Sequence, residues 1–166
     1  MMCVKNYKSI LWMTLGLGLL GTAGSFIAQY GYGLNPCPLC IFQRVSVMGV
    51  AIFSIIALLF PIRRWMSRVL TAIWVSIPAV FGWGVAVRQL YLQSLPKDQV
   101  PACGPGLNFM VQTMPFTDMI SKVLTGSGEC AEVQKFWAVP LPIWSIVLFS
   151  CVLLLLWWGV YRTRNH

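Results

Sequence analysis

The sequence predicts an all-α membrane protein, a bundle of four transmembrane helices with one long outer loop. Of the 166 residues, 58% are hydrophobic and only 10% are charged, so a soluble globule of this length would lack enough polar surface. Four apolar stretches each reach the roughly 20 residues that a helix needs to cross about 30 Å of hydrocarbon. The basic residues gather in segments that this topology places on one side.

The four predicted helices form a single membrane domain over 1–166. They cover about 10–30, 41–62, 69–92 and 139–161, and they leave outer loops at 31–40 and 93–138. Lys5 and Lys8 precede the first stretch, as they would precede a cleavable signal peptide. That stretch is longer than the roughly 7 to 15 residues of a signal core, so we expect a retained helix.

The net charge of +8 is explained better by membrane topology than by nucleic-acid binding. Basic side chains occupy the amino terminus, the connection between helices two and three, and the carboxyl terminus: Lys5, Lys8, Arg63, Arg64, Arg68, Arg162 and Arg164. The acids are all in the opposite loop: Asp98, Asp118, Glu129 and Glu132. By the positive-inside rule, we expect both termini in the cytoplasm and the loops at 31–40 and 93–138 on the other side.

Part of the long outer loop has the pattern of a short amphipathic helix. Apolar residues recur there at helical spacing: Phe116, Met119, Ile120, Val123 and Leu124. Polar residues take the opposite face, which predicts a helix lying flat on the membrane surface. The sequence Gly-Ser-Gly-Glu-Cys then ends this helix and presents Cys130.

A Cys-Pro-Leu-Cys motif opens the second helix. Pro38 suits the first helical position, which places Cys37 at the cap and Cys40 in the first turn. Arg44 follows Cys40 by four residues and therefore lies on the same helix face, about 6 Å deeper.

The six cysteines divide by topology. Cys3 is on the cytoplasmic side and Cys151 is in the middle of a helix, and both have a structural interpretation. The other four, Cys37, Cys40, Cys103 and Cys130, reach the outer side, where disulfides persist. Two structural disulfides and a redox relay both fit these four, whereas a zinc site is disfavoured because a second tight Cys pair is missing. We therefore expect no metal.

The Cys-x-x-C motif and Arg44 favour the redox interpretation. The small ring that this motif closes is more reducible than a long-loop disulfide. A helix amino terminus and a nearby cation favour the reactive thiolate form. An arginine inside the apolar slab is a functional candidate, with a snorkelling interface residue as the alternative.

A redox site needs an electron acceptor, and the residues point to one dissolved in the membrane. The chain has no G-x-G-x-x-G and no P-loop motif, so a bound nucleotide is not indicated. Its one histidine, His166, is at the carboxyl terminus, so a haem held by two histidines is excluded. A quinone remains, and Arg44 is positioned to stabilise both the Cys40 thiolate and a quinone carbonyl.

In combination these features resemble the DsbB family of disulfide bond formation proteins. The resemblance rests on "CPLC" followed by Arg44, on Cys103 and Cys130 in the outer loop, on "GECAE", and on the Pro142-x-Trp144 motif that opens the last helix. It implies a bacterial inner-membrane enzyme that reoxidises a periplasmic DsbA-like oxidase of thioredoxin fold and reduces ubiquinone or menaquinone.

The resemblance also implies roles for individual residues. Cys103 would form the mixed disulfide with the partner, and Cys130 would be its original bond partner. Cys37 would exchange with this loop pair, and Cys40 would face the quinone in a charge-transfer contact or adduct beside Arg44. Trp144 would belong to the same quinone site.

The chain departs from the family at Gln89. Family members often carry histidine after arginine near the outer end of helix three, whereas here Gln89 follows Arg88. Gln89 can hydrogen-bond a quinone oxygen but supplies no titratable proton, and Arg88 is either a second quinone-site residue or an interfacial anchor. The alternatives left open are a non-catalytic protein with two structural disulfides, a reductase that moves electrons the other way, and a paralogue with a dedicated partner.

Overall fold

The computed structural model describes residues 2–33, 37–62, 64–96, 115, 118, 131, 135–136 and 139–164. Within this part of the chain, four long helices are α1 (Met2–Tyr32), α2 (Pro38–Leu59), α3 (Trp65–Ser94) and α7 (Leu141–Arg162). Each contains a stretch that is long and apolar enough to cross a membrane. This confirms the predicted class, a bundle of four transmembrane helices.

Two short strands precede α7, and they were not predicted from the sequence. Strand β1 (Lys135–Phe136) pairs antiparallel with β2 (Val139–Pro140), and Phe136 lies opposite Val139. The surface helix expected from Phe116 to Leu124 falls outside the described residues, except for Asp118.

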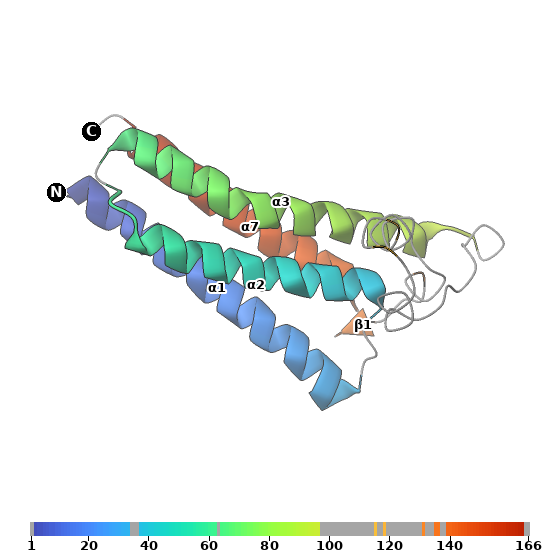
Figure 1. The fold of residues 1–166 in the computed structure, drawn as a ribbon. Coiled ribbons are helices and arrows are strands. Elements are labelled where there is room, and N and C mark those ends of the chain that lie inside the picture. Colours follow the sequence, from blue (N-terminus) through green and yellow to red (C-terminus); the bar gives the residue numbers. More distant parts are fainter. Residues whose placement is uncertain are drawn as a thin grey trace.

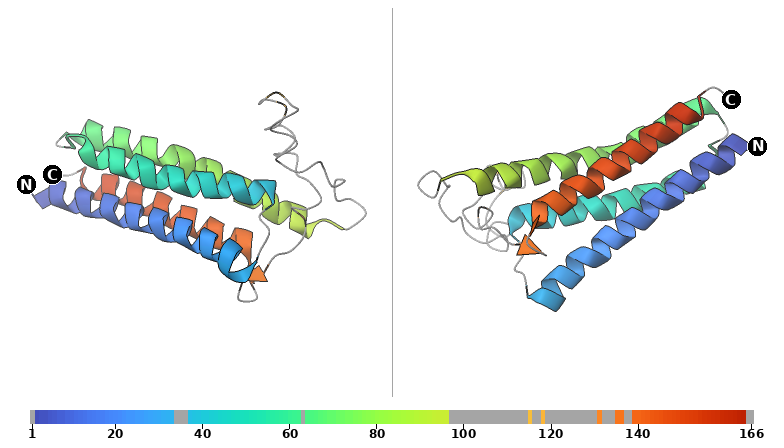
Figure 2. Two further views of the ribbon diagram at one scale, coloured as in Figure 1. Left: turned by 60° about the horizontal axis from the view of Figure 1, so that its bottom comes forward. Right: turned by 180° about the vertical axis from the view of Figure 1, so that it is seen from behind.

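The helices pack in a ring in which α1 contacts α2, α2 contacts α3, α3 contacts α7, and α7 returns to α1. Figure 1 shows both termini at one end of this bundle, together with the connection from α2 to α3. Toward the other end, α1 diverges from the remaining helices, as the rear view in Figure 2 also shows. The Cys-x-x-C motif lies at this second end, where α2 begins.

Prolines and a glycine explain where the helices end. Helix α2 stops three residues before the predicted boundary at 62 because Pro61 holds Phe60 in an extended conformation (φ −74°, ψ 147°). Pro96 has the same effect on Leu95, which follows α3 (φ −74°, ψ 144°). After α1, Gly33 adopts a φ of +64°, a conformation that glycine reaches without steric cost.

Small residues let the helices approach one another closely. A methyl group on Gly18 would lie 3.1 Å from the Ala51 backbone nitrogen, so α1 and α2 touch almost backbone to backbone there. A methyl group on Gly82 would lie 2.3 Å from Phe149 Cζ and 2.7 Å from Ser46 Cβ, where α2, α3 and α7 meet. The helix faces are thus fixed relative to one another along the middle of the bundle.

Arg68 closes the end that carries the termini. It is only 6% exposed, and it donates from Nε to the Ile62 carbonyl (3.2 Å) and from Nη1 to the Thr163 carbonyl (3.1 Å). The Tyr7 hydroxyl donates to the Arg68 carbonyl at 2.9 Å. These bonds join α1, α3, α7 and the α2–α3 connection, while the opposite end, where α1 diverges, carries the dithiol.

Candidate active site

The dithiol lies at the amino-terminal end of α2. Cys37 is the N-cap residue, with extended backbone angles (φ −69°, ψ 164°), and Pro38 is in the first turn, which confirms the predicted helix start. The Cys37 and Cys40 sulfur atoms are 3.1 Å apart. Cys37 is buried and Cys40 is partly exposed. Both sulfurs therefore lie at the positive end of the α2 helix dipole.

One buried glutamine contacts this dithiol, and a second buried glutamine contacts the first. Gln89 of α3 donates from Nε2 to the Cys40 sulfur at 3.2 Å and to the Cys37 sulfur at 3.5 Å. Gln43 of α2 donates from Nε2 to Gln89 Oε1 at 2.6 Å. The Cys40 sulfur also lies 3.6 Å from Gln89 Oε1. The side chain that the sequence marked as a departure thus contacts both sulfur atoms.

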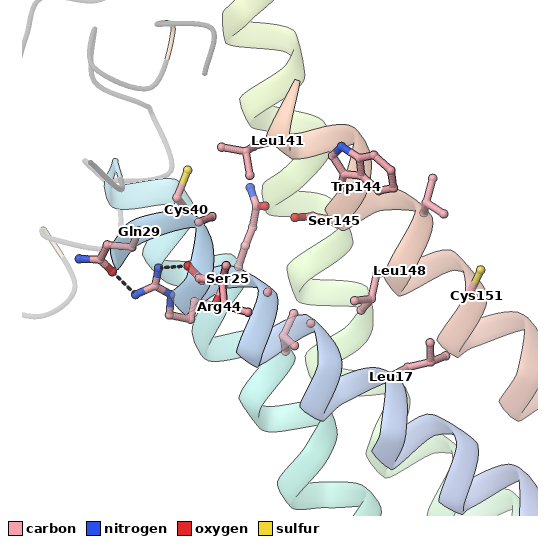
Figure 3. A pocket seen from close by; sticks show the side chains of 17 residues that line it. Leu17, Ser25, Gln29, Cys40, Arg44, Leu141, Trp144, Ser145, Leu148 and Cys151 are labelled. Atoms are coloured by element: carbon pink, nitrogen blue, oxygen red, sulfur yellow. Dashed lines mark hydrogen bonds between the residues drawn. The ribbon is translucent and has the colours of Figure 1, made fainter. Parts of the chain in front are cut away.

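Arg44 turns toward α1. Its Nη1 donates to Gln29 Oε1 at 2.6 Å and its Nη2 donates to the Ser25 carbonyl at 3.0 Å, as Figure 3 shows. The guanidinium carbon also lies 4.7 Å from the centre of the Phe26 ring. The Arg44 Nε is buried and has no hydrogen-bond partner among the described residues.

An apolar cavity of about 520 Å³ lies between α1, α2 and α7. Cys40 and Arg44 line it together with Trp144 at the first turns of α7 (Figure 3). Leu17 and Cys151 line it farther toward the middle of the bundle. Because Cys40 and these deeper residues line the same cavity, it connects the dithiol end of α2 with the apolar part of the bundle.

The structure brings together some of the predicted site residues and separates others. Arg44 and Trp144 share the cavity with Cys40, whereas Gln89 contacts the sulfurs without lining the cavity. Arg88 is not among the lining residues, and its guanidinium carbon lies 5.3 Å from the centre of the Tyr91 ring. Cys103 and Cys130 lie outside the described residues.

Three residues of the site, Gln43, Gln29 and Ser25, were not predicted from the sequence. Gln43 is 6% exposed and holds Gln89, while Gln29 and Ser25 hold Arg44. A polar side chain within an apolar membrane span is a signal of function, and the two glutamines carried that signal. The Ser25 contribution is a backbone carbonyl, for which the sequence offers no signal.

Comparison with known proteins gives one family and several relatives that share its description. The family model described as "Disulfide bond formation protein DsbB" matches residues 7–159. A Chromobacterium violaceum protein named "Disulfide bond formation protein B" is 44% identical over 149 residues, which cover 89% of this chain and 88% of that protein. Proteins of the same name from Acinetobacter baylyi and Neisseria meningitidis serogroup B are 38% and 37% identical, over 95% of this chain and 92% and 98% of their own lengths. No solved structure gave a significant match.

Proposed function

The chain belongs to the DsbB family of disulfide bond formation proteins, and from this premise we propose that it transfers electrons from a periplasmic dithiol to a membrane quinone. Family membership and the four apolar helices make it a multi-pass membrane oxidoreductase. The proposed electron donor is a DsbA-like oxidase of thioredoxin fold. The proposed orientation places both termini in the cytoplasm and the dithiol on the periplasmic side.

The placement of Cys40 carries this proposal. Its sulfur is 3.1 Å from that of Cys37, and its side chain lines the apolar cavity between α1, α2 and α7. A dithiol that only stabilised the fold would gain nothing from bordering such a cavity. This position suits a group that receives electrons by thiol exchange and delivers them to a lipid-soluble acceptor.

The cavity residues fit a quinone. A volume of about 520 Å³ lies within the range of about 300 to 1,000 Å³ that is typical of small-molecule sites. The lining is mostly apolar, and the buried Arg44 Nε, which has no partner among the described residues, is a donor suited to a carbonyl oxygen. Arg44 and Trp144 would hold the ring, and a bound quinone would accept two electrons and two protons.

The cysteines would transfer electrons by two exchange reactions. A thiolate of the partner attacks Cys103 in a Cys103–Cys130 disulfide, and the second partner thiol resolves the mixed disulfide. Two thiols on the partner become one disulfide, and Cys103 and Cys130 become thiols. These thiols then reduce a Cys37–Cys40 disulfide in the same way, so each step conserves the number of disulfides.

Trapping of the mixed disulfide tests this route. In Cys130→Ser, the Cys103 thiolate should attack the disulfide of an oxidised thioredoxin-fold oxidase and release one partner thiolate, so a mixed disulfide should accumulate, and added reductant should dissolve it. Cys151→Ser is the control and should accumulate none. If the Cys130→Ser protein formed no complex and the wild-type protein left the partner reduced, the two-disulfide structural alternative would be favoured.

The direction of electron flow needs a separate measurement. Reduced partner added to wild-type protein in detergent should consume quinone, seen as a loss of quinone absorbance. Consumption of quinol with reduction of an oxidised partner would instead identify a reductase.

A further inference from the structure

The structure assigns Gln43 a positioning role: we infer that it orients the Gln89 amide so that Gln89 donates hydrogen bonds to the dithiol. The inference rests on the proposed redox use of Cys37 and Cys40. Gln89 would then be the residue that touches the reacting sulfurs, and Gln43 would act through it.

The two glutamines are placed for this task by helix geometry. Gln43 follows Cys40 by three residues in α2, so both side chains lie on the same helix face. Gln89 reaches this face from α3, and it is only 3% exposed. Its amide therefore exchanges hydrogen bonds with protein groups rather than with bulk water.

The 2.6 Å bond between the glutamines engages the oxygen of the Gln89 amide and leaves its nitrogen for the sulfurs. A carboxamide has an oxygen that accepts and a nitrogen that donates, and the two are on opposite sides. Because Gln43 Nε2 donates to Gln89 Oε1, Gln89 Nε2 is the amide atom nearer to the sulfurs, at 3.2 Å from Cys40 and 3.5 Å from Cys37, while Oε1 lies 3.6 Å from the Cys40 sulfur. With Gln43 Nε2 as the donor, the opposite orientation of Gln89 alone would place two donor groups against each other.

This orientation matters because a buried thiolate needs donors. An unpaired negative charge away from water is costly, and hydrogen bonds to a charged group are stronger than those between neutral groups. The two N–H groups of Gln89 can serve the two sulfurs in turn, whichever carries the charge. An amide does not titrate, so this donation does not depend on pH.

The proposal predicts how fast the thiols react. Full-length protein in detergent is reduced, freed of reductant, and treated at pH 7 with iodoacetamide, and mass spectrometry follows alkylation at Cys37 and Cys40. Gln89→Leu should slow alkylation about tenfold, as expected when a charged group loses its hydrogen bonds. Gln43→Leu should slow alkylation about threefold, because without the hydrogen bond from Gln43 the Gln89 amide would donate to the sulfurs only part of the time.

The double variant separates positioning from a direct effect. Gln43→Leu combined with Gln89→Leu should react no more slowly than Gln89→Leu alone, because Gln43 acts only through Gln89. Ser46→Ala is the control in α2, because among the described residues its hydroxyl bonds to the Phe42 carbonyl of the same helix, at 2.8 Å. It should react at the wild-type rate.

Two results would overturn the inference. One is wild-type reactivity of both Gln43→Leu and Gln43→Met, of which the second keeps the length of the side chain without its donor. The other is a double variant slowed by the product of the two single effects. Circular dichroism verifies that each variant keeps its helices. The assay contains neither quinone nor partner, so a failure of the proposed electron transfer would appear separately, as unchanged quinone in the wild-type reaction.

Discussion

Arg44 belongs to α2 but is held by α1. A guanidinium within the apolar part of a membrane protein is costly unless its donors are satisfied. Gln29 and the Ser25 carbonyl satisfy two of them, at 2.6 and 3.0 Å, and the Phe26 ring covers one face. The position of Arg44 at the cavity wall therefore depends on the packing of α1 against α2.

Removal of the Gln29 amide should weaken the proposed acceptor site. In Gln29→Leu, Arg44 loses its shortest hydrogen bond, and bonds to charged groups contribute about 1.5–3 kcal/mol. We expect the KM for quinone to rise about tenfold, which corresponds to about 1.4 kcal/mol, with a small change in kcat. Initial rates over a quinone titration measure both constants.

Thr22→Val is the matched control for Gln29→Leu. The Thr22 hydroxyl bonds within α1, to the Gly18 carbonyl at 2.8 Å, and its side chain does not line the cavity. Its KM should equal that of the wild type. An unchanged KM in Gln29→Leu would mean that the hydrogen bond to Gln29 does not support the acceptor site.

For single residues, the sequence predicted which side chains belong to the site better than it predicted their contacts. The spacing of four residues put Arg44 and Cys40 on one face of α2, and both line the cavity. The guanidinium nevertheless points to α1. Its partners there are 15 and 19 positions away in the chain, so the local sequence pattern could not predict these contacts. The contact of Gln89 with the sulfurs likewise depends on the register of α3 against α2, which no local pattern specifies.

At the scale of elements, glycines fix how α3 packs. Gly82 and Gly84 lie two positions apart in α3, yet their surroundings differ. A methyl group at 82 would lie 2.3 Å from Phe149 Cζ, whereas a methyl group at 84 would meet nothing within 4 Å. Phe149 is fully buried, so its ring has little room to move.

Gly82→Ala should therefore destabilise the bundle. Overpacking typically costs about 1–3 kcal/mol, and we expect the Tm in detergent to fall by about 5 °C. Gly84→Ala should leave Tm unchanged or raise it slightly, because alanine favours the helix. Thermal unfolding followed by circular dichroism measures both variants, and equal Tm values would contradict the packing argument.

The helices themselves were largely predictable. Hydrophobic length gave their number and approximate positions, because a membrane span requires about 20 apolar residues whatever its tertiary contacts. Pro38 gave the start of α2 through its backbone restriction. The early end of α2 has a local cause in Pro61, whereas the extension of α1 back to Met2 passes beyond the apolar stretch that marked it.

At the scale of the whole molecule, several helices form the cavity jointly, and α1 diverges from its neighbours toward the dithiol end (Figure 1). Its wall combines residues from α1, α2 and α7, which are far apart in the sequence. From the sequence, Arg44 and Trp144 were predicted for the acceptor site, but the residues of α1 that complete the cavity wall were not.

A side chain that fills the cavity should block the acceptor without disturbing the fold. Gly24 lines the cavity, and a methyl group there would meet nothing within 4 Å. Gly24→Leu should raise the KM for quinone at least tenfold and leave Tm near the wild-type value. Gly16→Leu is the control, because Gly16 has equally open surroundings in the same helix but does not line the cavity. Equal KM values for the two variants would place the acceptor elsewhere.

The charge distribution predicts the orientation that we propose for the whole bundle. Figure 1 places both termini at one end, where the described basic residues include Arg64, Arg162 and Arg164, and the dithiol lies at the other end. Because basic residues favour the cytoplasmic side, green fluorescent protein fused after the last residue should fluoresce. Alkaline phosphatase, which needs disulfides, should be inactive at that position and active when inserted after Pro96. An active phosphatase at the carboxyl terminus, with no activity after Pro96, would reverse the orientation and separate the dithiol from any periplasmic partner.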